Sequence, residues 1–92
     1  MYTVEISRKA LKELKKLPID YIKKFREKFQ ELAENPYDVQ GTKKLINPKS
    51  LGIDLEEVYR IRVGDYRAIY SIENNVLTIY ILKVAHRKEV YQ

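Results

Sequence analysis

The sequence predicts an α+β domain in which two N-terminal antiparallel helices pack on one face of a small, mainly antiparallel β-sheet. Two observations support this prediction. After a short strand, the first half shows two amphipathic helical patterns joined by only a few residues. The second half shows three runs of β-branched and aromatic residues separated by tight turns, which is typical of an antiparallel meander. A chain of 92 residues is expected to form a single domain over residues 1–92.

The N-terminal segment alternates first and then takes on helical spacing. Residues 2–6 (YTVEI) alternate as in a short strand, and Ser7 is a suitable N-cap for a following helix. Across residues 8–17 the apolar side chains form one helical stripe, and most of the remaining positions are lysines. Pro18 is expected to end this helix.

A second helix is expected from Tyr21 to about Glu34. Asp20 is expected to cap its N-terminus, and Asn35-Pro36 is expected to stop it. The short joint between the two helices predicts that they run antiparallel. Residues 37–55 contain two glycines and a proline and are predicted to be mostly loop, with a brief strand pairing over residues 44–46.

A hairpin is predicted for VYRIRVGDYRAIYSI, residues 58–72, with a type II′ turn at Gly64-Asp65. This turn fixes the register, so that Arg62 lies directly opposite Arg67. Period-two alternation then puts Arg60 on the same face as these two arginines. The other face is expected to carry Tyr59, Ile61, Ala68 and Tyr70.

Three guanidinium groups on one hairpin face predict an anionic ligand. Two unit charges about 5 Å apart repel by roughly 3 kcal/mol at an effective dielectric of about 20. In the alternative interpretation this face is merely solvated, or its arginines pair with Glu56, Glu57 or Glu73. An acid opposite Arg62 would have stabilised the pair, so the arginine at that position favours anion binding.

A last strand follows a tight turn at Asn74-Asn75, because residues 76–85 (VLTIYILKVA) are apolar on both faces, as in a central strand. Pairing across this turn is expected to put Arg67 opposite Leu82 and His86 on the arginine side. The helices are expected to cover the face with Ile61, Ala68, Tyr70, Ile79 and Ile81. The face expected to be open to a ligand carries Arg60, Arg62, Arg67, Tyr80 and His86.

Composition excludes several classes of chemistry. The chain has no Cys and one His, which excludes disulfides and cysteine nucleophiles and argues against a structural zinc site. Acids are scattered and no Gly-rich phosphate loop is present, so neither a metal nor another cofactor is expected. No signal peptide or membrane span is visible, and a cytoplasmic protein without a membrane partner is expected. The net charge of +5 favours polyanionic partners.

Metal-free cleavage of RNA is the chemistry that fits these residues. RNA carries its own nucleophile, the 2′-OH, so a protein need only align it, stabilise the phosphorane oxygens and move two protons. Arginines suit the oxygens because their planar forks stay charged. His86 is the leading group for proton transfer, although a histidine at a strand end can also be a surface contact. Tyr91 could donate a proton, stack on a base or only pack at the end of the chain.

The combined pattern resembles the RelE branch of the RelE/ParE toxin superfamily. The similar segments are the helix motif S-x-x-A-x-x-E-L-x-K-L-P (residues 7–18), the hairpin YRIRVGDYRAIY (59–70) and the strand end KVAHRKEVY (83–91). The resemblance covers nearly the whole chain. It implies a RelE/ParE-like fold and a type II toxin that enters the ribosomal A site, contacts 16S rRNA and cleaves the bound mRNA codon. It also implies neutralisation by a RelB-like antitoxin.

The resemblance also implies roles for single residues. Arg67 matches the hairpin arginine that grips the scissile phosphate. Arg60 and Arg62 match a basic pair where some relatives carry lysines proposed to transfer protons; arginines practically never deprotonate, so both should bind charge instead. Arg87 resembles the basic residue after the last strand, and Tyr91 resembles the terminal catalytic tyrosine. Contacts to substrate or ribosomal RNA are assigned to Lys43, Lys44, Lys49 and Lys88.

Two further functions stay open at the level of sequence. A ParE-like toxin would bind DNA gyrase without catalysis on the same fold. A binding-only relative would hold its antitoxin or RNA and cut nothing. The arginine pair, with His86 and Tyr91 expected on one side, favours RNA cleavage.

Overall fold

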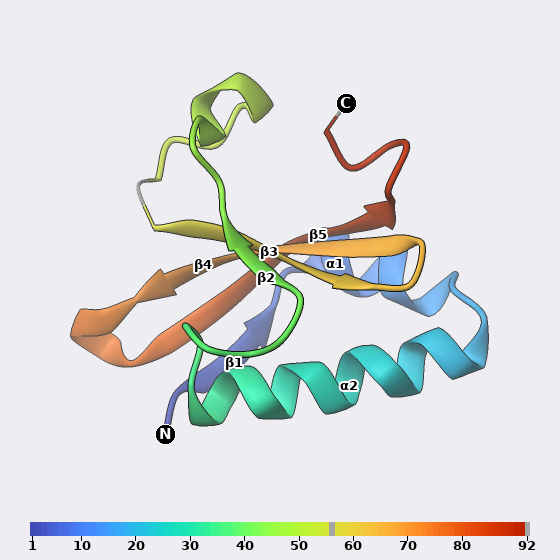
Figure 1. Ribbon diagram of the computed structural model, residues 1–92, viewed down its shortest axis with the longest axis horizontal. Helices are drawn as coiled ribbons and strands as arrows, with labels where there is room; N and C mark the ends of the chain where they lie inside the picture. The colour runs from blue at the N-terminus through green and yellow to red at the C-terminus, as the bar shows by residue number, and fades with distance from the viewer. Residues whose placement is uncertain (56, 92) are drawn as a thin grey trace.

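A computed structural model shows a five-stranded β-sheet with two helices packed on one face (Figure 1). It describes residues 1–55 and 57–91. The elements in chain order are β1 (Thr3–Ile6), α1 (Arg8–Lys15), α2 (Ile19–Glu34), β2 (Thr42–Lys44), β3 (Val58–Val63), β4 (Tyr66–Glu73) and β5 (Thr78–His86), with 3₁₀ turns at Pro48–Leu51 and Asn74–Val76. The predicted α+β class is therefore confirmed. Among the described residues, no helix is long and apolar enough to cross a membrane.

The strands are ordered β1-β5-β4-β3-β2. β3, β4 and β5 form the predicted antiparallel meander, and β2 adds an antiparallel edge strand to β3. β1 pairs in parallel with β5 at the opposite edge. Two parallel strands need a long connection between them, and the chain from β1 to β5 includes both helices.

The helix boundaries confirm one predicted cap and correct another. Ser7 caps α1, since its Oγ accepts a hydrogen bond of 3.0 Å from the Ala10 amide. α2 begins earlier than predicted, at Ile19, with Pro18 at the N-cap. The prediction that Asp20 caps α2 is therefore wrong. Proline holds φ near the helical value and lacks an N–H, so the helix starts directly after it, and Asp20 lies in the first turn.

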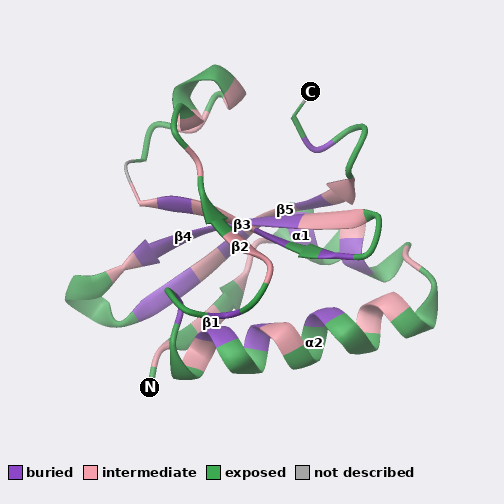
Figure 2. Ribbon diagram, in the orientation of Figure 1, coloured by how far each residue is buried: buried purple, intermediate pink, exposed green. Residues whose placement is uncertain are grey.

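The core lies between the helices and the sheet (Figure 2). The helices cover the sheet face that was predicted for them, because their apolar side chains pack against that face of the meander. This core includes the helical residues Ala10, Leu14, Phe25, Phe29 and Leu32 and the strand residues Ile61, Ala68, Tyr70, Ile79 and Ile81.

The other sheet face is covered in part, which corrects the prediction that it is left open to a ligand or partner. Val58 and Ile69 project there and are buried together with Val90 of the C-terminal tail. The loop after β2 packs against them through Leu45, Leu51 and Ile53. The brief pairing predicted for residues 44–46 is displaced to Thr42–Lys44, which leaves Leu45 free to join this second cluster.

The β4–β5 register differs from the prediction. Four residues connect the strands, so that Glu73 pairs with Thr78, and Leu77 has a left-handed φ of 47°. A β-bulge follows, because Tyr70 pairs with Ile81 but Ile69 pairs with Lys83. One extra residue in β5 inverts the facing of every residue after it.

Candidate active site

The β3–β4 hairpin has the register predicted from its turn. Val63 pairs with Tyr66 and Arg62 with Arg67, and Arg60 lies on the same face opposite Ile69. Gly64 has a φ of 57°, the left-handed value that a type II′ turn needs at its first central position. The turn therefore brings Arg62 and Arg67 together at the tip of the hairpin.

Helix α2 supports this turn from the side of the core. The ring of Tyr21 packs edge-on against Tyr66 with centroids 4.7 Å apart. A Cβ at Gly64 would lie 2.9 Å from the Tyr21 hydroxyl oxygen, closer than a side chain tolerates. Gly64 is thus required both for the turn and for its contact with the helix.

A groove with a volume of about 470 Å³ opens beside the hairpin tip. Its lining residues are Lys28, Gln40, Gly41, Arg62, Gly64, Arg67 and Arg87. Four cationic side chains from α2, β3, β4 and the tail thus converge on one hollow. This arrangement fits a phosphate group, because guanidinium groups bind two oxygens at once.

Arg67 is oriented by its own turn. Its Nη1 donates hydrogen bonds to the carbonyl oxygens of Gly64, at 2.8 Å, and Tyr66, at 3.0 Å. Partial burial lowers the pKa of Arg67, and the neighbouring charges of Arg60, Arg62 and Arg87 lower it further, while Tyr91 acts in the opposite direction. The strand register confirms the prediction that Arg60, Arg62 and Arg67 share one face of the hairpin.

Arg60 is held against the edge of the sheet. Its Nη1 donates a hydrogen bond of 2.6 Å to the carbonyl oxygen of Gly41, just before β2. Gly41 has a φ of 94°, and a Cβ there would press on the Arg62 backbone at 3.2 Å. Lys43 pairs with Arg60 across β2 and β3 and so adds a cation on this face.

The C-terminal tail is tied to the hairpin turn. The Arg87 amide donates a hydrogen bond of 2.7 Å to the Asp65 carbonyl, and its Nε lies 3.8 Å from the Asp65 carboxylate. Val90 is fully buried in the second cluster and anchors the tail. Tyr91 is 51% exposed and near enough for its phenol to affect the pKa of Arg67.

His86 does not lie on the arginine side, so that prediction is wrong. The bulge in β5 pairs His86 with Tyr66 on the helix side of the sheet, and the two rings meet edge-on with centroids 5.5 Å apart. Its Nδ1 accepts a hydrogen bond of 3.2 Å from the Lys88 amide. Arg67 pairs with Ala85 instead of the predicted Leu82.

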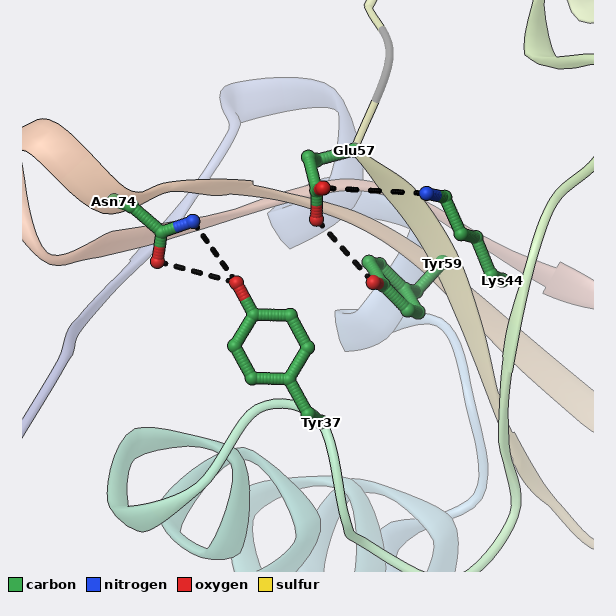
Figure 3. Close-up of polar contacts among 5 residues, drawn as sticks. All are labelled: Tyr37, Lys44, Glu57, Tyr59 and Asn74. Carbon is green, nitrogen blue, oxygen red and sulfur yellow. Dashed lines mark hydrogen bonds and ion pairs between the residues drawn. The ribbon is translucent and has the colours of Figure 1, made fainter.

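The remaining predicted lysines lie apart from the groove lining. Lys44 and Glu57 form an ion pair of 3.9 Å on the other side of β2 (Figure 3). Lys49 forms an exposed ion pair of 3.9 Å with Asp54, and Lys88 is exposed in the tail. Lys28 was not predicted as a site residue, because in the sequence it is only one of several polar positions on α2.

The acids proposed as alternative partners do not neutralise the arginine face in the described part of the chain. Glu57 pairs with Lys44 and accepts a hydrogen bond of 3.2 Å from the Tyr59 hydroxyl (Figure 3). Glu73 forms no ion pair with the three hairpin arginines in residues 1–55 and 57–91. Glu56 lies outside the described residues. Within the same ranges, no three His, Cys, Asp or Glu side chains cluster closely enough to hold a metal ion.

Known proteins resemble this chain over nearly its whole length. Residues 4–91 match the family model described as the ParE toxin of the type II toxin-antitoxin system parDE. A protein named as toxin RelE1 of Methanocaldococcus jannaschii is 37% identical in an alignment that covers 99% of this chain and 96% of that protein. Toxin RelG of Mycobacterium tuberculosis is 32% identical, with 99% and 97% covered.

Solved structures give the same result. The archaeal RelE–RelB complex from Pyrococcus horikoshii contains a chain that is 30% identical, with a TM-score of 0.77 and coverage of 97% of this chain and 98% of that one. The toxin-antitoxin complex RelBE2 of Mycobacterium tuberculosis contains one that is 31% identical, with a TM-score of 0.73 and coverage of 94% and 98%. The matched residues of the family model include the hairpin and the tail that form the groove.

Proposed function

Because this chain belongs to the RelE branch of the ParE/RelE toxin family of type II toxin-antitoxin systems, we propose that it is a ribosome-dependent mRNA endonuclease. It would cleave codons in the ribosomal A site and thereby inhibit translation. The observation that supports this most strongly is the groove in which Lys28, Arg62, Arg67 and Arg87 converge. Four cations around one small hollow fit a bridging phosphate of RNA better than they fit a neutral ligand.

The proposed reaction uses the nucleophile that RNA supplies. The 2′-oxygen attacks the adjacent phosphorus, the bond from phosphorus to the 5′-oxygen breaks, and a 2′,3′-cyclic phosphate and a 5′-hydroxyl end result. One proton leaves the 2′-OH and one reaches the departing 5′-oxygen. The protein would align these atoms and stabilise the extra negative charge of the phosphorane oxygens.

Arg67 and Arg62 are the proposed ligands of those oxygens. The turn carbonyls hold Nη1 of Arg67, which orients the guanidinium before the substrate arrives. Its partial burial strengthens its interaction with an anion, because less water competes. Each such donor to a developing oxyanion contributes on the order of 3 kcal/mol to transition-state stabilisation.

Arg60 and Arg87 are proposed to bind charge around this centre. Arg87 lines the groove directly. Arg60 is not part of the groove lining, because it donates a hydrogen bond to the Gly41 carbonyl, but its charge adds to the positive potential there. Neither arginine deprotonates at neutral pH, so a role as general base is not proposed for them. Lys43, Lys44, Lys49 and Lys88 remain proposed contacts to ribosomal RNA at a greater distance from the reaction.

Proton transfer is proposed to involve Tyr91, with His86 as a second candidate. The exposed phenol of Tyr91 affects the electrostatics at Arg67, but it lines a separate hollow with Leu45 and Leu51 and not the groove itself. We propose that it reaches the 5′-oxygen and donates a proton when RNA is bound. The Nδ1 of His86 accepts a hydrogen bond from the Lys88 amide, and the ring faces Tyr66. Separate His86→Gln and Tyr91→Phe proteins distinguish the two, since only loss of the proton-transfer group should lower kcat strongly.

A RelB-like antitoxin is the proposed cellular partner. The similar toxin chains from Pyrococcus horikoshii and Mycobacterium tuberculosis were solved in complexes with RelB and in the RelBE2 pair. An antitoxin segment with acidic side chains would neutralise the groove cations and exclude RNA. In the cell, the proposed nuclease would therefore act only after release from its antitoxin.

A gyrase inhibitor is the second candidate function, because the matching family model is described as a ParE toxin. In that case the arginine face would be a docking surface without catalysis. A binding-only relative would behave similarly toward RNA. Both alternatives predict that messages stay intact when translating ribosomes meet the purified protein.

The test is to add the antitoxin-free protein to a reconstituted translation reaction and map the 3′ ends of the message. Cuts within A-site codons that require translating ribosomes would support the proposal. Ribosomes without a message in the A site and the Arg67→Ala protein serve as controls. If the message stays intact in every reaction and the protein instead blocks supercoiling by purified gyrase, the nuclease proposal is wrong and the protein is a gyrase inhibitor.

A further inference from the structure

The exposed face of α1 carries a ridge of cations separate from the groove. Its members are Arg8, Lys9, Lys12, Lys15 and Lys16, all exposed. At about 100° per residue, these five side chains fall within an arc of about 120° around the helix. The buried residues Ala10 and Leu14 occupy the opposite side. We call this set the α1 ridge.

The α1 ridge has no neutralising partner in the described part of the chain. The helix contains one acid, Glu13, whose Oε1 accepts a hydrogen bond of 3.0 Å from the Val84 amide of β5. None of the ridge cations forms an ion pair with a described residue. Arg8 and Lys9 also lie in the first helical turn, where the helix dipole disfavours positive charge, whereas Lys12 and Lys15 lie in the last turn, where it favours positive charge. A bound polyanion would relieve both effects.

The ridge and the groove lie toward the same end of the molecule. The Glu13–Val84 hydrogen bond fixes α1 beside the C-terminal half of β5, and β5 leads directly to Arg87 in the groove. The α1–α2 connection and the β3–β4 turn point toward the same end of the longest axis (Figure 1). One large RNA can therefore contact both surfaces.

We propose that the α1 ridge binds the phosphate backbone of double-helical RNA while the groove holds the message, an inference that rests on the proposed nuclease function. The ridge contains only lysines and one arginine, without the aromatic side chains on which single-stranded bases stack. Its helix spans about 12 Å, a rigid rod suited to the regular phosphates of a duplex.

This second surface accounts for a requirement for the ribosome. The groove of about 470 Å³ is small and holds only a short piece of a message. Binding energy from phosphates bound at the ridge would position the message for reaction in the groove. A free message lacks that second attachment.

The test measures binding by fluorescence anisotropy as a function of salt, with a 16-base-pair RNA duplex and its single strand as probes. Lys9→Gln/Lys12→Gln removes two ridge cations, and Lys23→Gln/Arg26→Gln removes two exposed cations of α2 as the matched control. We expect the salt slope for the duplex to fall by about 1 per removed ridge cation, and affinity to fall about tenfold. Equal losses in the ridge and control variants would overturn the proposal, and so would equal losses for duplex and single strand.

A kinetic readout separates this proposal from the proposed function. With translating ribosomes, the ridge variant should raise KM about tenfold and leave kcat within twofold of the unmodified protein. The charge-preserving Lys9→Arg/Lys12→Arg should restore both the KM and duplex binding. If neither the unmodified protein nor any variant cleaves a message, the proposed function is wrong. The duplex-binding measurement still shows whether the α1 ridge binds RNA. A ridge variant with unchanged duplex binding and an unchanged KM would eliminate the ridge as an RNA surface.

Discussion

At the scale of the residue, Arg67 combines the features that a phosphate ligand needs. Two carbonyl oxygens of its own turn orient Nη1, so little conformational entropy remains to be lost when RNA binds. Crowding by Arg60, Arg62 and Arg87 makes the site unfavourable without an anion. These contacts are polar and peripheral, so the side chain contributes to function more than to folding.

The substitution Arg67→Ala should therefore separate activity from stability. We expect cleavage by translating ribosomes to fall by about 100- to 1,000-fold, the usual effect of losing one donor to a developing oxyanion. The melting temperature should stay within about 3 °C, because the side chain lies outside both apolar clusters. The yield of mapped 3′ ends and a thermal melt measure the two effects, with Lys23→Ala as control. A melting temperature that collapses together with activity would mean that Arg67 is structural.

For His86 we expect the opposite of Arg67, a small effect of substitution on cleavage. Because its ring faces Tyr66 on the helix side, His86→Gln should lower kcat less than tenfold and leave the pH profile of kcat unchanged below pH 8. Single-turnover cleavage between pH 5 and pH 9 measures this. If His86→Gln removes an inflection that the unmodified protein shows below pH 8, His86 is the proton-transfer group after all.

At the scale of the element, the β3–β4 turn is the part whose geometry the site depends on. Gly64→Ala should destabilise the protein by about 1 to 3 kcal/mol, since it adds a Cβ at positive φ and presses on Tyr21. Urea denaturation followed by circular dichroism measures the loss, and Gly52→Ala is a useful control. Gly52 also has positive φ, but its added Cβ would meet nothing within 4 Å. Equal losses at both glycines would show that the Tyr21 contact adds nothing.

β4 is also joined to the segment just after α2 by the buried hydrogen bond of 3.0 Å from the Tyr70 hydroxyl to the Pro36 carbonyl. Tyr70→Phe should cost about 1 kcal/mol at pH 7, because that carbonyl loses its donor. Burial raises the pKa of Tyr70 above its ordinary value of 10.0, with smaller contributions from Tyr59 and Tyr37. The unfolded chain then releases its proton first, so stability is fully present below pH 10 and is lost as pH rises above it.

The free energy of unfolding should accordingly fall more steeply above pH 10 in the unmodified protein than in Tyr70→Phe. Urea titrations at several pH values between 8 and 11.5 measure both curves. Tyr59 stays in both proteins, so its own raised pKa cancels in the difference. Parallel curves would show that Tyr70 titrates normally.

At the scale of the whole molecule, local chemistry could be predicted and long-range register could not. The β3–β4 pairing followed from two turn residues, and Ser7 followed from its place before a helical stripe. The strand after β4 is apolar on both faces, so its sequence carries no alternation that would reveal the bulge between Ile69 and Tyr70. That bulge alone moved His86 to the helix side.

The candidate site shows the same division. Arg62 and Arg67 were predicted as neighbours because one turn sets their distance. Lys28 reaches the groove only through the packing of α2 across the sheet, and no local pattern encodes that packing. The loop that covers Val58 and Ile69 was missed for a related reason, since its apolar residues lack any periodicity.

The most direct test of the central claim, that the arginine groove promotes attack by the 2′-OH of RNA, uses a chemically altered message. A programmed ribosome would carry an A-site codon with a single 2′-deoxynucleotide at the position where the unmodified codon is cut. Cleavage should disappear at that position, while toxin binding to the ribosome stays within about twofold. Continued cleavage at the 2′-deoxy position would contradict the claim, because the nucleophile would then have to come from elsewhere.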